Sequence, residues 1–189
     1  MPVSGIRGAH NIRLGSHLCL FYRRPQEYLQ VTASFLKAGI VKNEFCVWVL
    51  PPPLTIAFAL DELLYCGLNG PRLQATKQLK IMSAEDCWFS NGALDMGRSR
   101  SRLAALPSMA RHLGYERVRL AGGPGPFTSE EGRQAFMTYE RRATAVIAES
   151  PVIALCGYAS TECVETAMFD IMSAHPQALL RTHAGWVNI

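Results

Sequence analysis

A histidine and a cysteine that could do chemistry together lie in the apolar segment 16–22. His17 and Cys19 are separated by one residue, and side chains two apart on a strand point to the same face. An imidazole beside a thiol could ligate a metal ion or haem, or contact a ligand. The other interpretation is a hydrogen-bonded strand histidine next to a core cysteine, and the sequence leaves both open.

Two further pairs follow apolar segments directly. Tyr22 and Arg23 end the first segment, where an aromatic face and a guanidinium could hold a small polar or anionic ligand or could fill the site themselves. Glu85 comes after another short apolar segment and precedes Asp86. These two carboxylates could act as a base or as metal ligands, or they could stabilise a helix N-terminus.

Glycines mark two more candidate segments. Gly122 and Gly123 precede prolines, and their amides could form an anion-binding nest, with a rigid turn as the alternative. Cys156, Gly157 and Tyr158 end another apolar segment. A thiol becomes reactive only where a cation or a helix N-terminus lowers its pKa. We therefore expect Cys156 to be buried and Tyr158 to contact a ligand.

The elements that must position these residues alternate along the chain. Apolar segments predict strands, helical spacing predicts helices, and the strand segments lack the alternation of a half-exposed sheet. Strands are expected at 16–22, 44–50, 79–83, 117–121 and 151–158, with an edge strand within 179–189; helices are expected at 26–41, 54–66, 99–113 (interrupted at Pro107), 128–149 (capped by Thr128) and 162–174. The pattern predicts an α/β fold of three layers, a mostly parallel sheet with helices on both faces. We expect an irregular segment at 1–14 and a single domain at 15–189.

Parallel sheets bind ligands beyond the carboxyl ends of their strands. We therefore expect the site to draw on residues 22–25, 51–52, 83–86, 122–124 and 158–160. The strand–loop–helix–strand order of residues 15–49 resembles RecA-like ATPases, particularly the circadian-clock KaiC type. Such proteins place GxxxxGK[ST] before the helix, whereas residues 23–27 read Arg-Arg-Pro-Gln-Glu. The sequence therefore predicts a RecA/KaiC-like fold without a Walker A loop and without ATP hydrolysis.

Three motifs in register resemble those of the MEDS domain, the sensory domain of methanogen and methylotroph regulators. They are the H-x-C-x-F-Y run at 17–22, Tyr-Glu-Arg-Arg at 139–142 followed by the segment 151–158, and His-Pro at 175–176. The resemblance covers roughly residues 14–180 and implies a signal-input domain for simple hydrocarbon derivatives, joined to a DNA-binding or histidine-kinase module. This chain departs from the family where Gly-Glu-Met would carry an acid at 122–124, and where Ala159 replaces an aspartate.

Composition narrows the classes of protein. The 189 residues carry a net charge of +4 with dispersed Lys and Arg, apart from Arg98, Arg100 and Arg102, so we expect no direct nucleic-acid binding. No apolar run approaches the roughly 18 residues that span a bilayer, and the six cysteines include no CxxC pair. We expect a cytoplasmic protein with no cofactor, no metal site of paired-ligand spacing and no membrane association.

The expected function is a non-catalytic signal-input domain. It would bind a small molecule through His17, Cys19, Tyr22, Arg23, Glu85, Gly122, Gly123 and Tyr158. No helix-turn-helix or kinase core is visible, so we expect the output in a signalling partner protein, with a homodimer as an open question. Two alternatives remain: a structural protein-interaction module with a plugged nucleotide site, and a nucleotide-dependent or thiol enzyme using His17 with Cys19 or Cys156.

Overall fold

The computed structural model describes residues 4–9, 12–90, 93–127, 129–163, 165–183 and 185–189. Within these ranges seven strands form one sheet in the order β3-β2-β6-β7-β1-β8-β9. Neighbouring strands are parallel, except for the antiparallel β8–β9 pair at one edge. The strands are β1 (His17–Tyr22), β2 (Phe45–Leu50), β3 (Leu79–Ser83), β6 (Val118–Gly122), β7 (Val152–Ala159), β8 (Gln177–Thr182) and β9 (Gly185–Asn188).

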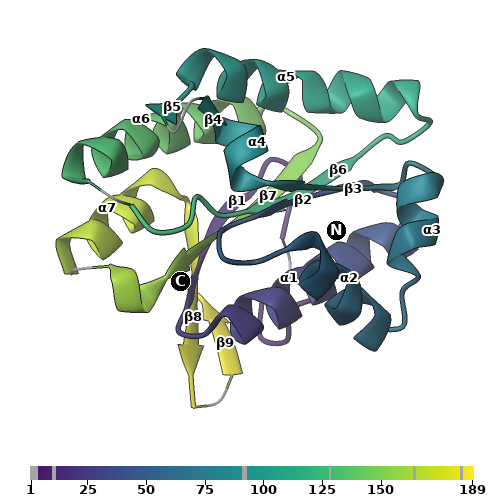
Figure 1. Ribbon diagram of the computed structural model, residues 1–189, viewed down its shortest axis with the longest axis horizontal. Coiled ribbons are helices and arrows are strands. Elements are labelled where there is room, and N and C mark those ends of the chain that lie inside the picture. Colours follow the sequence, from purple (N-terminus) through teal and green to yellow (C-terminus); the bar gives the residue numbers. More distant parts are fainter. Residues whose placement is uncertain (1–3, 10–11, 91–92, 128, 164, 184) are drawn as a thin grey trace.

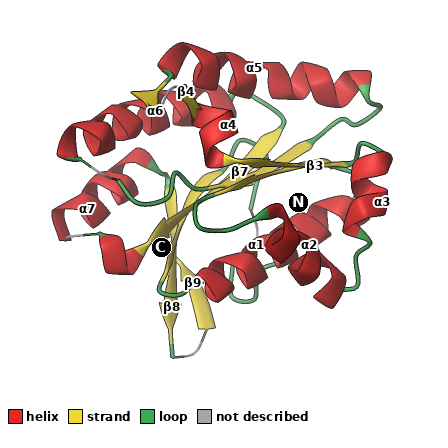
Figure 2. Cartoon of the chain, viewed as in Figure 1, coloured by secondary structure: helices red, strands yellow, loops and turns green. Residues whose placement is uncertain are grey.

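Helices cover both faces of this sheet (Figures 1 and 2). One face packs against α1 (Pro25–Val41), α2 (Ile56–Tyr65) and α3 (Gly70–Ala75). The other packs against α4 (Ala84–Trp88), α5 (Met96–His112), α6 (Glu130–Ala148) and α7 (Glu165–Ala174). Every residue of β1 and β2 is buried, because both faces of these central strands lie under helices. The predicted three-layer α/β fold with a mostly parallel sheet is confirmed.

The expected element boundaries hold to within a few residues at most positions. The stretch after β3, which the sequence did not assign, contains α4 and a two-stranded ribbon of β4 (Phe89–Ser90) and β5 (Ala93–Leu94). The short α3 was not expected. The predicted edge strand is a hairpin whose first strand, β8, pairs with β1. A 3-10 turn at Ser160–Glu162 precedes α7.

The predicted interruption at Pro107 is wrong, because α5 continues through this residue to His112. Proline removes one helical hydrogen bond, but packing of Leu103 and Ala110 into the core holds the helix on both sides of it. The cap of α6 is Ser129, whose side chain accepts a hydrogen bond from the Gly132 amide. The predicted cap, Thr128, lies outside the described residues.

A buried ion pair joins the N-terminal segment to the sheet. Arg119 on β6 pairs with Glu44 just before β2, and both side chains are shielded from solvent. The Arg119 guanidinium also donates to the carbonyl oxygens of Phe35 (2.9 Å) and Ser4 (3.2 Å). The irregular segment is thereby held against α1, with Ile6, Ala9 and Ile12 buried in the same core.

None of the helices in the described part of the chain combines the length and apolar character that a membrane span requires.

Candidate functional site

A cavity of about 670 Å³ opens at the carboxyl edge of the sheet. Leu50 ends β2, Ser83 ends β3, and Pro124 follows β6, and all three line this cavity. The first turns of α6 form another wall through Ala135 and Phe136. Its size falls within the range of ligand pockets, about 300–1,000 Å³, and its position is the one where open parallel sheets bind ligands.

The lining of this strand-end cavity is mostly apolar. Its aromatic and aliphatic wall includes Leu54, Phe89, Leu94, Pro126, Phe127 and Phe136. The polar groups are Ser83, Glu85, Ser129 and Glu131, and both carboxylates are exposed. The cavity therefore suits a small organic molecule with a largely apolar body.

Among the residues expected to bind a ligand, Glu85 lines this cavity. Gly122 ends β6 and Gly123 follows it, but a side chain at either position would collide with neighbours. A Cβ at Gly122 would lie 2.7 Å from the Trp88 ring, and one at Gly123 would lie 2.5 Å from the carbonyl oxygen of Gly157. These glycines permit close packing of the sheet against α4 and β7.

Tyr22 and Tyr158 lie on opposite faces of the sheet. Phe21 is the register partner of Tyr158, so Tyr22 is one residue out of phase and points the other way. The Tyr22 ring packs against Tyr28 of α1 with centroids 5.2 Å apart. The structure therefore does not bring these two tyrosines into one site.

A carboxylate of the protein itself lies at the start of α1, the kind of helix end that can bind phosphate. The carboxylate of Glu27 accepts a hydrogen bond from the Arg23 amide (2.9 Å) and lies near the guanidinium groups of Arg24 (3.5 Å) and Arg181 (3.8 Å). Burial raises the pKa of Glu27, but the two arginine amides and guanidiniums outweigh it and lower the pKa below its usual value. In other proteins a helix N-terminus can bind phosphate, whereas here it binds a carboxylate of the chain itself. The Arg23 side chain is exposed.

A second constellation of polar side chains is buried between the sheet and α6 and α7. It consists of His17, Glu140, Cys156 and His175, whose ligand-type atoms all lie within 4.8 Å of one another. The His17 Nε2 atom lies 3.2 Å from Cys156 Sγ and 3.3 Å from Glu140 Oε2. His175 Nε2 lies 3.7 Å from the same Glu140 oxygen. We call these four residues the His/Glu/Cys cluster.

Hydrogen bonds outside the cluster fix the tautomer of each histidine. The Thr144 hydroxyl donates to the Ala174 carbonyl (2.7 Å), so it accepts from Nδ1–H of His17 (2.7 Å). Nδ1–H of His175 donates to the Ile171 carbonyl (2.7 Å). Each imidazole therefore directs the lone pair of Nε2 into the cluster. His175 Nε2 finds no hydrogen-bond partner in the described part of the chain.

Charges in the cluster follow from burial and from these contacts. Burial raises the pKa of Glu140, but the neighbouring histidines and the Tyr158 hydroxyl, which donates to Glu140 at 2.8 Å, lower it overall. Burial, with a smaller effect of the nearby His17, lowers the pKa of His175 to about 4. Burial and the Glu140 charge raise the pKa of Cys156 well above its usual value. The protein alone thus holds a carboxylate, a neutral thiol and a neutral His175 at pH 7.

Cys19 shares a strand face with His17, as the spacing predicts, but the thiol that hydrogen-bonds to that histidine belongs to Cys156 on β7. Cys19 is the register neighbour of Cys156, and its thiol lies 3.7 Å from the Gln177 carbonyl. Burial raises the pKa of Cys19 to about 12. Neither thiol has the lowered pKa that a nucleophile needs.

Sequence reasoning missed Glu140, Thr144 and His175 as site residues. Glu140 and His175 stand within motifs that carry the family resemblance, which was the available signal. Thr144 gave none, because one polar residue on a long helix is ordinary. Only the packing of α6 and α7 on β1 and β7 brings these three side chains to His17.

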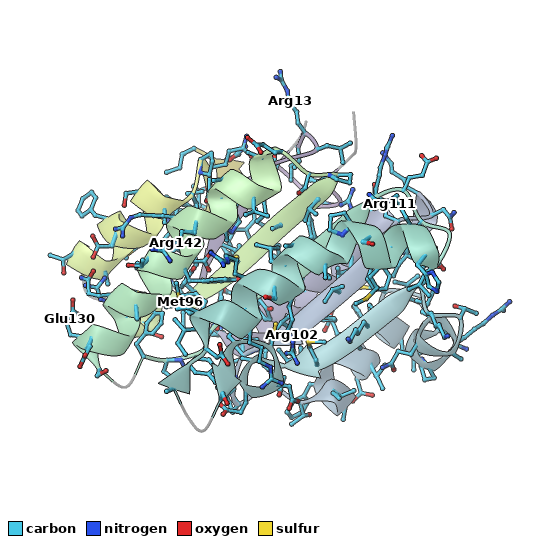
Figure 3. The ribbon with its side chains drawn as sticks, turned by 90° about the horizontal axis from the view of Figure 1, so that it is seen from above. Arg13, Met96, Arg102, Arg111, Glu130 and Arg142 are labelled. Atoms are coloured by element: carbon cyan, nitrogen blue, oxygen red, sulfur yellow. The ribbon has the colours of Figure 1, made fainter. Side chains whose placement is uncertain are left out.

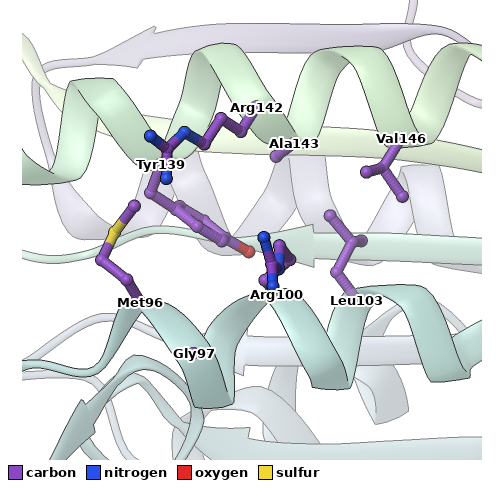
Figure 4. A pocket seen from close by; sticks show the side chains of 8 residues that line it. All are labelled: Met96, Gly97, Arg100, Leu103, Tyr139, Arg142, Ala143 and Val146. Atoms are coloured by element: carbon purple, nitrogen blue, oxygen red, sulfur yellow. The ribbon is translucent and has the colours of Figure 1, made fainter.

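A smaller hollow of about 220 Å³ lies between α5 and α6. The two helices run side by side over the sheet, with Met96 and Arg102 on α5 and Glu130 and Arg142 on α6 (Figure 3). Tyr139 forms the floor, and Arg100 and Arg142 extend from opposite walls (Figure 4). Both guanidinium groups are on exposed residues, so this hollow is a shallow feature of the helix layer.

Comparisons with known proteins bear on this fold and on both sites. Among curated proteins, none matches the chain. The family model described as MEDS, the methanogen/methylotroph, DcmR sensory domain, matches residues 16–176. The matched residues include β1 with its histidine, Glu140 on α6 and His175 after α7. Because the match covers most of the 189 residues, the chain belongs to the MEDS family of sensory domains.

Proposed function

We propose that this sensory domain is a non-catalytic receptor for a small, largely apolar molecule, and that the molecule binds in the strand-end cavity. The observation that carries the proposal is the cavity of about 670 Å³ at the carboxyl ends of β2, β3 and β6. Its apolar wall and polar rim fit a simple hydrocarbon derivative with one polar group. Glu85 contacts the polar end of the molecule from the rim.

Occupancy of the cavity is relayed to a partner protein, a transcription regulator or a kinase, in the cytoplasm. The family assignment supports this part of the proposal, because a sensory domain reports to an output. Helix α6 is the element best placed to report binding. Its first turns line the cavity, and its middle carries Glu140 and Thr144 into the buried polar layer. A second copy of the chain is an additional partner to be tested by measuring the mass in solution.

The test is a binding screen with defined probes. Short alcohols, aldehydes and chlorinated alkanes are titrated against the full chain, and binding is followed by thermal unfolding and by native mass spectrometry. A probe at 100 times its Kd should stabilise the folded state by about 2.7 kcal/mol. Failure of every probe class to bind would count against the receptor function.

Two variants on one helix locate the site. Ala135 lines the cavity and Gln134 is its exposed neighbour outside the lining. Ala135→Trp should fill the cavity and abolish probe binding, whereas Gln134→Trp should leave it unchanged. Equal binding by both variants would move the ligand elsewhere in the molecule.

A protein-interaction module with a plugged nucleotide site is the second candidate function. It is favoured by the Glu27 carboxylate, which takes the anion position at the start of α1. This candidate expects no probe to bind, whereas the receptor expects one class of probe to bind. The same screen therefore separates the two functions.

A further inference from the structure

The His/Glu/Cys cluster has the composition and geometry of a metal centre. Its four ligand-type atoms are two imidazole nitrogens, one carboxylate oxygen and one sulfur. Zinc is bound in proteins by this set of atoms, at about 2.0–2.3 Å from the ion in a tetrahedron. Such bond lengths separate neighbouring ligand atoms by roughly 3.3–3.8 Å. The distances from Glu140 Oε2 to His17 Nε2 (3.3 Å) and to His175 Nε2 (3.7 Å) fall in this range. Those from Cys156 Sγ to His17 Nε2 (3.2 Å) and to Glu140 Oε2 (4.0 Å) lie just outside it, and all pairs lie within 4.8 Å.

Lone pairs converge in this cluster without enough donors to satisfy them. In the neutral imidazoles both Nε2 atoms are acceptors, because each Nδ1–H donates outside the cluster. The Cys156 thiol has one proton, and it reaches His17 at 3.2 Å. Nothing in the described part of the chain donates to His175 Nε2, and this residue is buried, with only 6% of its surface exposed. A buried acceptor without a partner is costly, and a cation at the centre would satisfy all four side chains together.

The contacts around the cluster are those that orient metal ligands. Histidine ligands usually donate the other ring N–H to a carboxylate, a carbonyl or a hydroxyl, and ligating carboxylates are themselves hydrogen-bonded. Here Thr144 receives His17, the Ile171 carbonyl receives His175, and the Tyr158 hydroxyl donates to the second oxygen of Glu140. These partners, from α6, α7 and β7, orient three of the four ligand side chains.

We propose that His17, Glu140, Cys156 and His175 bind one divalent zinc-type ion. Binding replaces the proton of the Cys156 thiol, which leaves to solvent, with a sulfur–metal bond. The carboxylate and the thiolate then balance the two positive charges of the ion in a buried site. Four protein ligands close the coordination sphere, as in structural rather than catalytic zinc sites. The ion fastens α6 and α7 to β1 and β7.

The test measures metal in the full chain purified without chelators from zinc-supplemented medium. We expect about one zinc ion per chain, the content of a single four-ligand site. Cys156→Ser and His175→Gln should each lose most of the metal. The matched control is Cys19→Ser, which removes a buried thiol from the same sheet face and should retain the full content. A zinc-free wild type, or variants that keep the wild-type content, would overturn the proposal.

A spectroscopic readout keeps the proposal testable if a ligand variant folds poorly. Protein from cobalt-supplemented medium should show tetrahedral ligand-field bands and a thiolate-to-cobalt charge-transfer band in both the wild type and Cys19→Ser. Loss of that band in Cys19→Ser would show that Cys156 is wrongly assigned as the sulfur ligand. Absence of the band from the folded wild type would exclude the site. Thr144→Val removes no ligand, but it should weaken zinc affinity by roughly 10–100-fold by releasing His17. Unchanged affinity would contradict the role of Thr144 as a positioning residue.

The strand-end cavity contains none of the four proposed ligands. Probe binding and metal content are therefore independent results, and either can fail without the other.

Discussion

Arg119 and Glu44 form an ion pair between the sheet and α1, and both side chains are shielded from solvent. Two hydrogen bonds to backbone carbonyls and the Phe35 ring 4.9 Å from the guanidinium add to the contacts of Arg119. Taking two charges out of water is costly, and the pair is sustained only because each charge is compensated. A buried pair of this kind is sensitive to loss of one partner.

We therefore predict that Glu44→Gln lowers the free energy of unfolding by about 3–5 kcal/mol, because it removes the carboxylate charge that faces the buried Arg119 guanidinium. Chemical denaturation measures the change. The control is Glu130→Gln, which removes an exposed carboxylate from an ion pair with Arg133 and should destabilise the protein far less, because solvent screens an exposed pair. A small loss for Glu44→Gln would show that water reaches Arg119 in solution.

Glu27 gives a pH-dependent contribution to stability. Burial acts to raise its pKa, yet hydrogen bonds and nearby arginines bring the folded-state pKa below the ordinary value. A group of this kind stabilises the folded state above the pKa of the unfolded chain, and the contribution disappears as pH falls through the folded pKa. Glu27→Gln should therefore destabilise the protein at neutral pH, and the two proteins should converge in strong acid. An equal difference at both pH values would mean that the carboxylate charge contributes nothing.

The sequence predicted the secondary structure around the site residues better than the contacts that their side chains make. Segment 16–22 was correctly read as a buried strand, and the shared face of His17 and Cys19 followed from strand geometry. The partner of His17 could not be read from spacing, because Cys156 and Glu140 are far away along the chain and approach only when β7 and α6 pack on β1. The pairing of Arg119, within β6, with Glu44, just before the neighbouring strand β2, likewise gave no signal in the sequence.

At the scale of elements, the alternation of strands and helices was predictable because the long helices carry an apolar face and the central strands are mainly apolar. The short α3 and the α4–β5 region were not, since few residues define their periodicity. The proline in α5 misled the prediction for a physical reason. Local propensity disfavours a helix through Pro107, whereas the burial of Leu103 and Ala110 on either side favours one, and tertiary packing prevails.

This competition predicts the effect of Pro107→Ala. Proline inside a helix is about 3 kcal/mol less favourable than alanine, part of which packing recovers. We expect the variant to raise the free energy of unfolding by about 1–3 kcal/mol with no change in helix content. Chemical denaturation and far-ultraviolet circular dichroism provide the measurement. A destabilised variant would mean that the proline ring makes contacts worth more than the missing hydrogen bond.

Helix α6 connects the two sites on its face of the sheet. Ala135 and Phe136 line the strand-end cavity, and Glu140 joins the His/Glu/Cys cluster on the next turn. The Phe136 ring also packs against Tyr139 with centroids 5.5 Å apart. A ligand that shifts α6 at the cavity would act on a helix whose middle is held by the cluster. Helix α6 is therefore the element that links ligand binding to the stability of the helix layer.

At the scale of the whole molecule, the exposure of the six cysteines shows how well the helix layers shield the two cores from solvent. Cys19, Cys46 and Cys156 are buried in the two cores, and Cys66, Cys87 and Cys163 are partly exposed. The thiolate is the reactive form of cysteine, and burial raises the pKa of Cys19 to about 12. Lack of access thus protects all three buried thiols, and a raised pKa keeps Cys19 and Cys46 protonated as well.

We predict that an aromatic disulfide reagent modifies the three partly exposed thiols of the folded protein first. We expect the three buried thiols to react only at the rate at which the whole protein unfolds, because they lie in the cores on both faces of one sheet. Peptide mass mapping over time distinguishes the two groups, and denatured protein gives the reference of six reactive thiols. Fast labelling of Cys19 and Cys156 with Cys46 still protected would show that α6 and α7 open from the sheet alone. That result would place the motion of the domain in the helix layer that carries the cluster and one wall of the cavity.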